Sequence, residues 1–554
     1  MTKPQKILFL SIIILAIFLR FFGLDKFPPS LFSDEVDLGY QAYSLLKTGK
    51  DYNGNLLPIS FQSFADFRAP LYIYTVVPLV AILGLNEWAV RLPAAFFGIL
   101  AVYGIYFLVR TLGFGAWVGM ISSFLLAISP WHLQYSRVGF EVTLMLSLLI
   151  LGTACFISGL KNRSLLLIST VLFALTLYSY STAKLFVPIF VIGLIIIFAK
   201  ELFKLSLKFK ILLIFFFLLI ATPMISDTII GKGLFRFSYT SIFADSTIPK
   251  EIDILREIDS KKETVELGQK SNLISKFSHN KIFSLGEVFL KNYLSAFSTN
   301  FLFINGDHIG RHSVGKMGEF YLVEIITFLA GVFWLVKFGK GIQKKLFASW
   351  LLLAPIPSSL TVGGGDHATR LILMLPPLIM ISALGFYNLW SYLWRENFKK
   401  ALFVLLIIFF TVNLYFYFHQ YYIHHPIEQE RLWHYGFKQA ILKTENLQPD
   451  YEKILFTPTT EPPLIFVLFW TRYDPLQFQG KGFVENLGKY SFLPLGSDLN
   501  AEDLERSLDK NTLVVANRKD VGVDLRREKI EGVKPLDIIK YPSGEVAFYI
   551  LTHE

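Results

Sequence analysis

Long apolar runs, separated by short polar connections, dominate the chain up to about residue 420. A helix that crosses a bilayer needs about 20 apolar residues, because each residue adds 1.5 Å to its length. The sequence therefore predicts eleven spanning helices, near residues 7–24, 91–110, 115–131, 140–160, 164–181, 185–199, 210–227, 319–337, 345–362, 371–393 and 401–421. A shorter run at 70–85 contains Pro78, and we expect it to lie along the outer membrane surface as an interfacial helix.

Basic residues gather in every second connection between these runs. They are Lys3, Lys6, Arg110, Lys161, Arg163, Lys200, Lys204, Lys208, Lys210, Lys337, Lys340, Lys344, Lys345, Arg395, Lys399 and Lys400. Because Lys and Arg are enriched in cytoplasmic loops, we predict a multi-pass protein of the plasma (inner) membrane, with its N-terminus cytoplasmic and its C-terminus extracytoplasmic. The first run lacks a small-residue cleavage site and is predicted to be an uncleaved anchor.

The pattern changes after residue 421, where short segments rich in β-branched and aromatic residues alternate with turns. The predicted strands are Lys453–Pro458, Pro463–Trp470, Asn511–Asn517 and Glu545–Leu551. The predicted fold class is mainly α. A polytopic helical transmembrane domain spans residues 1–421, with outer loops at 25–90 and 228–318, and a small extracytoplasmic soluble α/β domain spans residues 422–554.

Composition agrees with a membrane protein. Hydrophobic residues make up 53% of the chain and charged residues only 17%, whereas about a quarter of the residues in soluble proteins are charged. The net charge of +10 is explained by the basic cytoplasmic loops, so it does not indicate nucleic-acid binding. The single cysteine, Cys155, excludes an internal disulfide.

Candidate chemistry begins in the stretch LFSDEVDLGYQAY, residues 31–43, directly after the first apolar run. Its carboxylates Asp34, Glu35 and Asp37 open a predicted helix. Acidic residues are common at helix N-termini, where the helix dipole favours them, so capping alone would account for them. Their predicted position on the outer side, however, places them beside other polar groups.

Several polar side chains are predicted at the same outer ends of the spans. They are Arg91, His132, Arg137, Glu141, Tyr178, Tyr180, Lys184, Asp307, His308, Arg311, His312, Asp366, His367 and Arg370. A single Arg or Lys at this depth commonly extends to the interface. Ionisable groups at the edge of a bilayer are nevertheless costly, and they usually pair or serve a site. We therefore expect a shared functional site on this face.

A carboxylate beside cationic groups suits transfer from a lipid-linked phosphate. Arg, Lys and His neutralise the departing phosphate, and Asp takes the proton of the attacking acceptor. The run Gly363–Gly365 would add N–H groups to a phosphate nest. His308 and His312 are four residues apart, but Gly310 between them fits a loop as well as a helix. We therefore predict no metal and no cofactor, although a divalent cation is compatible with the residues.

The sequence resembles a known enzyme class in SDEVDLGYQAYSLLKTGKDYNG, FRAPLYIY, EWAVRLPAAFFG and SPWHLQYSRVGFE. These segments are similar to GT-C membrane glycosyltransferases that use polyprenyl-phosphate sugars, in particular the protein O-mannosyltransferase and aminoarabinose-transferase-like branch. The resemblance is best over residues 1–200 and looser over 300–395, through NGDHIGRHSVGKMGEFY and GGGDHATRLILMLPP. The absence of a WWDYG-type stretch argues against the oligosaccharyltransferase branch.

The resemblance implies a donor lipid held in a groove between spans, and inverting transfer of a hexosyl or pentosyl unit to a glycan, lipid or protein acceptor. By position, Asp34 resembles the catalytic carboxylate and Glu35 its companion. Arg68 stands where the family often has Lys or His, and Ala69 replaces a proline. We assign Arg137, Lys184, His367 and Arg370 to the donor phosphate or lipid, and Asp66, Arg68, Arg91, Glu141, Tyr180, Asp307 and Arg311 to the acceptor or to supporting roles.

Two other functions remain open from the sequence. A transporter or flippase of a lipid-linked glycan would need ionisable residues near mid-membrane or paired broken helices, whereas the charges here lie mainly at one end of the spans. A noncatalytic membrane scaffold would use the C-terminal domain to bind a partner.

Overall fold

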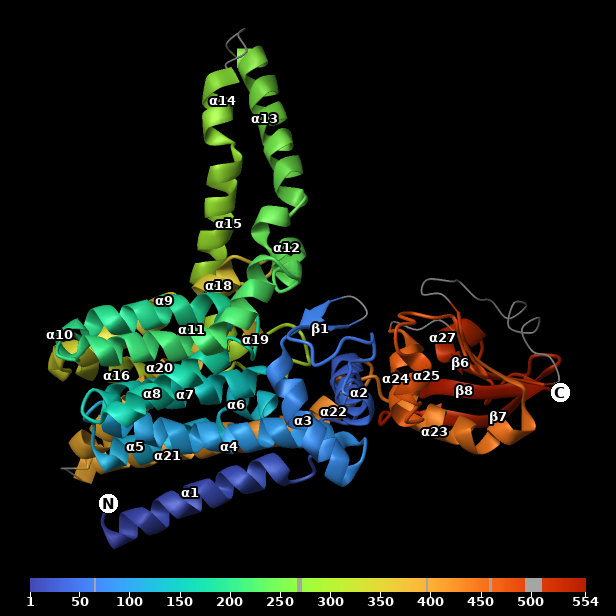
Figure 1. Ribbon diagram of the computed structural model, residues 1–554, viewed down its shortest axis with the longest axis horizontal. Helices are drawn as coiled ribbons and strands as arrows, with labels where there is room; N and C mark the ends of the chain where they lie inside the picture. The colour runs from blue at the N-terminus through green and yellow to red at the C-terminus, as the bar shows by residue number, and fades with distance from the viewer. Residues whose placement is uncertain (64–65, 267–271, 395–396, 458–460, 494–510) are drawn as a thin grey trace. The chain divides into compact units, whose positions relative to one another are not determined.

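The computed structural model describes residues 1–63, 66–266, 272–394, 397–457, 461–493 and 511–554 (Figure 1). It divides into two compact units. The first contains residues 1–16, 100–132 and 145–414, and the second contains residues 17–99, 133–144 and 415–554. The boundary expected near residue 421 stays a prediction.

Helices dominate the first unit, and in the described residues six stretches are long and apolar enough to cross a membrane. This confirms the prediction of a mainly helical, polytopic membrane protein. The stretches are α1 (Lys3–Phe21), α4 (Glu87–Thr111), α7 (Val142–Gly159), α11 (Leu207–Ile229), Ala368–Leu393 with α19 (Ala368–Leu371) and α20 (Leu375–Leu393), and Lys399–Glu428 with most of α21 (Asn397–His419) and with α22 (His425–Glu428). The predicted cation Arg395 lies outside the described residues.

The other five predicted spans are shorter than expected. They form α5 (Ala116–Ile128), α8 (Arg163–Thr176), α9 (Ala183–Ile197), α16 (Glu324–Phe338) and α17 (Gly341–Leu353), each of 13 to 15 residues. The run at 115–131 shows why a helix is shorter than the predicted span. Its helix stops at Ile128, because Pro130 disfavours helical backbone at Ser129 and opens the next helix, α6 (Pro130–Tyr135). The apolar residues continue past the helix end.

Two glycines allow α16 and α20 to pack closely. A Cβ atom on Gly331 would lie 1.9 Å from the carbonyl oxygen of Ile381, and one on Gly385 would lie 1.8 Å from that of Thr327. Small residues let membrane helices approach through their backbones. The two glycines therefore fix this helix pair.

Gly385→Ala is expected to destabilise the protein by about 1–3 kcal/mol, the typical cost of overpacking, because the added methyl group meets backbone rather than a side chain that can move. Thermal unfolding in detergent measures the effect. Gly286→Ala in α15 (Lys281–Ser295) is the matched control, since a Cβ there meets nothing within 4 Å. Equal melting temperatures for Gly385→Ala and wild type would contradict the close contact.

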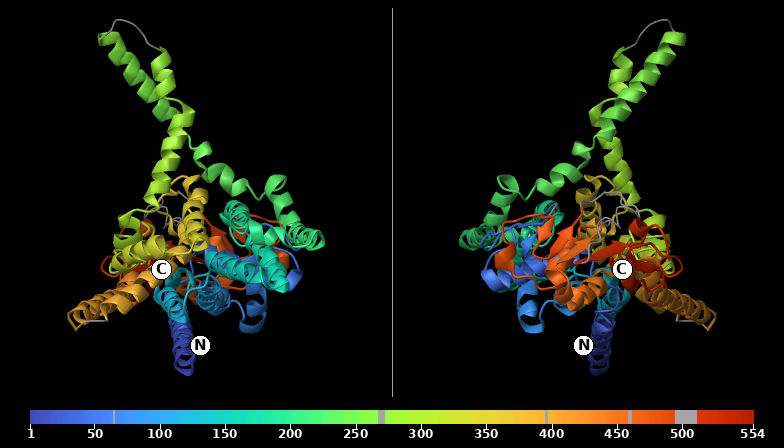
Figure 2. Two further views of the ribbon diagram at one scale, coloured as in Figure 1. Left: turned by 90° about the vertical axis from the view of Figure 1, so that its left-hand side faces the viewer. Right: turned by 90° about the vertical axis from the view of Figure 1, so that its right-hand side faces the viewer.

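A helical hairpin occupies much of the predicted outer loop 228–318. After α12 (Phe235–Thr240), the helices α13 (Thr247–Glu266), α14 (Asn272–Ser278) and α15 project from the other helices of the first unit (Figures 1 and 2). The short helices α10 (Ala199–Phe203) and α18 (Ile356–Ser359) complete the connections of this unit.

After the last residues of α1, the second unit contains α2 (Ser33–Thr48), the two-residue strands β1 (Phe61–Gln62) and β2 (Phe67–Arg68), and α3 (Pro70–Leu83). The run at 70–85 is thus a helix, and its interfacial position stays a prediction. Near the C-terminus a six-stranded sheet has the order β4-β5-β3-β6-β8-β7, with β3 parallel to β5 and β6 and the other pairs antiparallel.

The strands of this sheet are β3 (Lys453–Phe456), β4 (Asn486–Leu487), β5 (Tyr490–Phe492), β6 (Thr512–Asn517), β7 (Val533–Lys540) and β8 (Val546–His553). Helix α23 (Phe437–Leu447) precedes β3, α25 (Pro475–Phe478) lies between β3 and β4, and α27 (Arg518–Val521) lies between β6 and β7. Three of the four predicted strands are confirmed, although Pro458 lies outside the described residues. The fourth was wrong, because Pro463–Trp470 is helix α24 and is buried on all sides. Periodicity cannot distinguish a strand from a helix in a continuous apolar run.

Candidate functional site

Helix α2 carries the predicted acidic residues, and a buried ion pair fixes its first turn. Glu35 and Arg91 are both fully buried, with Arg91 Nε 2.8 Å from Glu35 Oε1 and Arg91 Nη2 2.9 Å from Glu35 Oε2. The backbone N–H of Gly139 also donates to Glu35 Oε1, at 2.8 Å. Glu35 therefore joins three segments of the second unit through its carboxylate.

Arg91 and Arg137 also hold the backbone that leads into α2. Arg91 donates to the carbonyl oxygens of Leu24, Pro28 and Ser30. Arg137 donates to those of Leu19, Phe22, Gly23 and Phe27 and to the Tyr421 hydroxyl. The carbonyl groups at the end of a helix and in a buried loop need such partners. Every guanidinium nitrogen of Arg137 thus already donates to the protein, which does not favour the donor-phosphate role assigned to it.

A second cluster surrounds Arg68. Its Nη2 lies 2.6 Å from Asp34 Oδ1, its Nε 2.9 Å from Asp37 Oδ2, and its Nη1 3.9 Å from Glu141 Oε1. The Tyr52 hydroxyl donates to Asp37 Oδ1 at 2.7 Å. Three carboxylates therefore share one guanidinium.

The three carboxylates around Arg68 differ in their exposure to solvent. The Asp34 side chain is 47% exposed, whereas those of Asp37 and Glu141 are 4% and 9% exposed. Burial raises the pKa of the Asp37 carboxyl, although Arg68 and the Tyr52 hydroxyl oppose this rise. Burial acts to lower the pKa of Arg68, but the charges of Asp34, Asp37 and Glu141 outweigh it and hold that pKa above its ordinary value. Asp34 is thus the carboxylate of this cluster that an acceptor molecule reaches most easily.

In the first unit, Asp307 organises a group of histidines. Its Oδ2 lies 3.1 Å from His312 Nδ1 and 3.8 Å from His367 Nδ1, and it accepts the N–H of Ala368 at 2.8 Å. Burial acts to raise the pKa of Asp307, but the hydrogen bond and charge of His312 outweigh it and lower that pKa. Burial and then the charge of Arg370 lower the pKa of His367 to about 2, so its imidazole is neutral at neutral pH. The predicted outer residues 307, 312 and 367 therefore meet.

Arg370 lies beside this group in α19. Its Nη1 donates to the Thr361 hydroxyl at 2.6 Å and to the Val362 carbonyl at 3.1 Å. Its Nε and Nη2 donate to no acceptor in the described parts of the chain. Arg236 of α12 adds a second positive charge to the electrostatic surroundings of Arg370 and His367. The two free nitrogens of Arg370, with a second positive charge in their surroundings, form a suitable site for an anion.

The glycine run forms a tight turn. Gly363 has a φ of +62°, and a Cβ on Gly364 would lie 1.9 Å from the carbonyl oxygen of Ser358. The Gly364 N–H donates to the Thr361 carbonyl, so it cannot also donate to a phosphate. The run makes the tight turn that brings Thr361 to Arg370, and a phosphate nest built from its other two N–H groups stays a prediction.

The remaining predicted site residues do not form a further cluster with one another in the described chain. Lys184 Nζ donates to the Gly233 carbonyl at 3.2 Å, and Tyr180 is buried and interacts electrostatically with Arg370. Arg311 is half-buried in the loop between Asp307 and His312, and Asp66 accepts the N–H of Phe67 in the β1–β2 turn.

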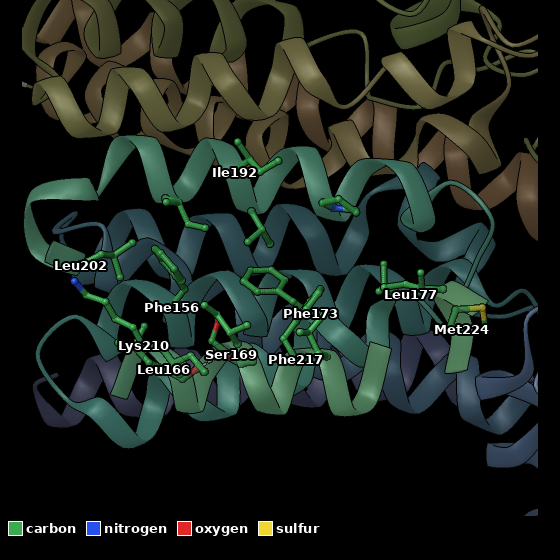
Figure 3. A pocket seen from close by; sticks show the side chains of 18 of the residues that line it. Phe156, Leu166, Ser169, Phe173, Leu177, Ile192, Leu202, Lys210, Phe217 and Met224 are labelled. Carbon is green, nitrogen blue, oxygen red and sulfur yellow. Dashed lines mark hydrogen bonds between the residues drawn. The ribbon is translucent and has the colours of Figure 1, made fainter. Parts of the chain in front are cut away.

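An apolar groove of about 750 Å³ lies among α7, α8, α9, α10 and α11 in the first unit. Figure 3 shows Phe156, Phe173 and Phe217 on its walls, with Lys210 at one end and Met224 at the other. Lys184 also lines it. Because Lys184 contacts Gly233 just beyond α11, it belongs to the end of the groove opposite Lys210.

The predicted residues thus fall into two groups, one in each unit. The second unit brings together Asp34, Arg68 and Glu141, and separately Glu35 with Arg91. The first unit brings together Asp307, His367 and Arg370. Tyr52, Arg236 and Thr361 were not among the predicted site residues, because tertiary contacts alone place them and no spacing in the sequence indicates them.

Residues 68–226 match the family model of the dolichyl-phosphate-mannose-protein mannosyltransferases. No curated protein sequence matches the chain. The resemblance to membrane glycosyltransferases is therefore confirmed in sequence over these residues, which include Arg68, Arg91, Arg137, Glu141 and Lys184.

Solved structures extend the similarity to the whole fold. ArnT from Cupriavidus metallidurans, bound to undecaprenyl phosphate, is 10% identical with a TM-score of 0.51, over 99% of this chain and 98% of that one. The oligosaccharyltransferase AglB from Archaeoglobus fulgidus, in complex with an inhibitory peptide and a dolichol-phosphate, is 13% identical with a TM-score of 0.52, over 93% of this chain and 69% of that one. Its apo form gives a TM-score of 0.54 at 13% identity, over 93% and 70%. The chain has the GT-C fold of these membrane proteins.

Proposed function

We propose that this chain, with its GT-C fold, is a glycosyltransferase that moves a sugar from a polyprenyl-phosphate carrier to an acceptor hydroxyl, with Asp34 as the base. The observation that carries the proposal is the cluster of Asp34, Asp37, Glu141 and Arg68, in which Asp34 alone is well exposed. The match over residues 68–226 to an enzyme family named for dolichyl-phosphate-mannose supports the donor class.

The proposed reaction is a single displacement. The acceptor oxygen attacks the anomeric carbon while its proton passes to Asp34, and the bond from that carbon to the phosphate oxygen breaks. The electron pair leaves with the polyprenyl phosphate. Attack from the side opposite to the leaving group inverts the anomeric configuration.

Arg68 orients the proposed base, Asp34. An arginine 2.6 Å from Asp34 stabilises its charged form. Because Asp37 and Glu141 share the same guanidinium, the cluster carries more negative than positive charge when all its groups are ionised, and it can accept a proton from the acceptor. Glu35, which is fully buried against Arg91, serves in this proposal to hold α2 rather than to react.

The donor phosphate is assigned to Arg370, whose Nε and Nη2 are free to donate, with the charge of Arg236 nearby. The prenyl chain is assigned to the groove of Figure 3, because its lining is almost wholly apolar and Lys184 adds a cation. An isoprenoid chain gains by leaving water for such a surface.

Arg370→Ala is expected to raise the KM for the donor about 10- to 100-fold, since a hydrogen bond to a charged group contributes about 1.5–3 kcal/mol. Steady-state kinetics with a polyprenyl-phosphate sugar measure the change. Arg256→Ala, which removes a guanidinium from the projecting hairpin, is the control and keeps the wild-type KM. An unchanged KM in Arg370→Ala would remove Arg370 from the donor site.

The reaction class itself is tested with a panel of radiolabelled polyprenyl-phosphate sugars and purified protein in detergent, with release of polyprenyl phosphate as the readout. Release with at least one donor supports the proposal. Specific binding of the lipid without release from any donor would favour the transporter function.

A further inference from the structure

Asp307, His312 and His367 bring three metal-ligand side chains to one point of the first unit. One ligand atom from each lies within 4.8 Å of the other two. The carboxylate oxygen Asp307 Oδ2 is 3.1 Å from His312 Nδ1 and 3.8 Å from His367 Nδ1, and the two imidazole rings are 4.7 Å apart. The loop after residue 306 supplies two of the side chains, and the turn before α19 supplies the third.

We propose that these three residues bind a Zn²⁺ ion. Ligands at about 2.0–2.2 Å from a tetrahedral zinc ion stand about 3.4 Å from one another, and the two distances to Asp307 Oδ2 lie on either side of this value. The set of two imidazole nitrogens and one carboxylate oxygen suits zinc rather than Mg²⁺ or Ca²⁺, which prefer oxygen ligands.

His367 distinguishes a metal site from an ordinary histidine–aspartate pair. Its Nδ1 is buried and has no hydrogen-bond partner in the described residues. A buried polar atom without a partner is costly. The hydrogen bond between His312 and Asp307 gives His367 no partner, whereas a metal ion bound to Asp307 Oδ2 would use the free nitrogen.

Backbone groups orient the carboxylate. Ile309 N–H donates to Asp307 Oδ1 at 2.8 Å, and Ala368 N–H donates to Oδ2 at 2.8 Å. Such outer contacts fix the direction of metal ligands. With three protein ligands, a tetrahedral ion keeps a fourth position for water or an anionic oxygen. The ion would join the loop at 307–312 to the turn that carries Arg370, and this inference does not depend on the proposed transfer reaction.

The first test is zinc binding by the full chain in detergent. After removal of metal with a chelator, equilibrium dialysis against Zn²⁺ is expected to give about one tightly bound ion per chain for wild type, and addition of Zn²⁺ is expected to raise its melting temperature. In His367→Ala, the affinity is expected to fall at least about 10-fold and the rise in melting temperature to disappear.

His279→Ala is the matched control, because His279 also pairs with a carboxylate, Asp259 at 3.0 Å, but lies outside the three-residue cluster. It is expected to bind zinc as wild type does. Co²⁺ bound to wild type should give the intense visible bands of a tetrahedral site, a measurement that needs no variant and stands if His367→Ala does not fold. Absence of stoichiometric zinc in wild type, or equal zinc affinity in wild type and His367→Ala, would overturn the proposal.

Discussion

Asp34→Asn is expected to lower the rate of sugar transfer by about 100-fold or more, the usual contribution of a general base, while the protein stays folded. An asparagine has the shape of the aspartate, and its amide oxygen still accepts from Arg68, but it cannot take the acceptor's proton. Because Asp34 is 47% exposed, loss of its charge is expected to change stability little. Release of polyprenyl phosphate measures the rate, and thermal unfolding in detergent measures the stability.

Asp25→Asn provides the control for Asp34→Asn. Asp25 precedes α2 in the loop held by the two buried arginines, and it takes no part in the cluster around Arg68. It is expected to keep the wild-type rate. A folded Asp34→Asn protein that transfers sugar at the wild-type rate would exclude Asp34 as the base. Asp37 and Glu141 would then be the remaining candidates for the base in this cluster.

Hydrophobic periodicity predicted the helical membrane protein because apolar length is a local property of the sequence. It predicted helix ends less well, because apolar residues such as Trp131 continue beyond the helix and are buried by tertiary contacts. It also failed at Pro463–Trp470, where all eight side chains are buried and no alternation remains to identify a helix or a strand.

The acidic stretch at the start of α2 shows how far a site is predictable from sequence. Asp34 and Glu35 are neighbours with the same charge, yet successive residues of a helix point about 100° apart. One therefore faces the buried arginine and the other the partly open cluster, and the sequence alone does not say which. The resemblance named both as catalytic, whereas the geometry favours a different role for each.

The contacts around Asp307 could not be predicted, because their residues are far apart in the sequence. His312 and His367 are 55 residues apart and meet at Asp307 through a loop and a glycine turn. The i, i+4 spacing of His308 and His312 did not lead to a predicted metal site, and His308 is 67% exposed and belongs to no three-residue metal cluster in the described chain. The histidine that joins the cluster is the one that sequence spacing could not indicate.

Glu35→Gln is expected to have the opposite effect to Asp34→Asn and to destabilise the protein by about 3–5 kcal/mol, the cost of breaking a buried ion pair from one side. Arg91 would remain buried with its charge uncompensated, while it is still held by three backbone carbonyls.

The expected readout for Glu35→Gln is a lower melting temperature and loss of folded material in detergent, measured beside Asp34→Asn. Any folded fraction is expected to transfer sugar, because in the proposed reaction Glu35 positions α2 and does not exchange a proton. If Glu35→Gln were as stable as wild type but inactive, the two acids would act together on the acceptor, as the resemblance implied, and the buried pair with Arg91 would have to open during the reaction.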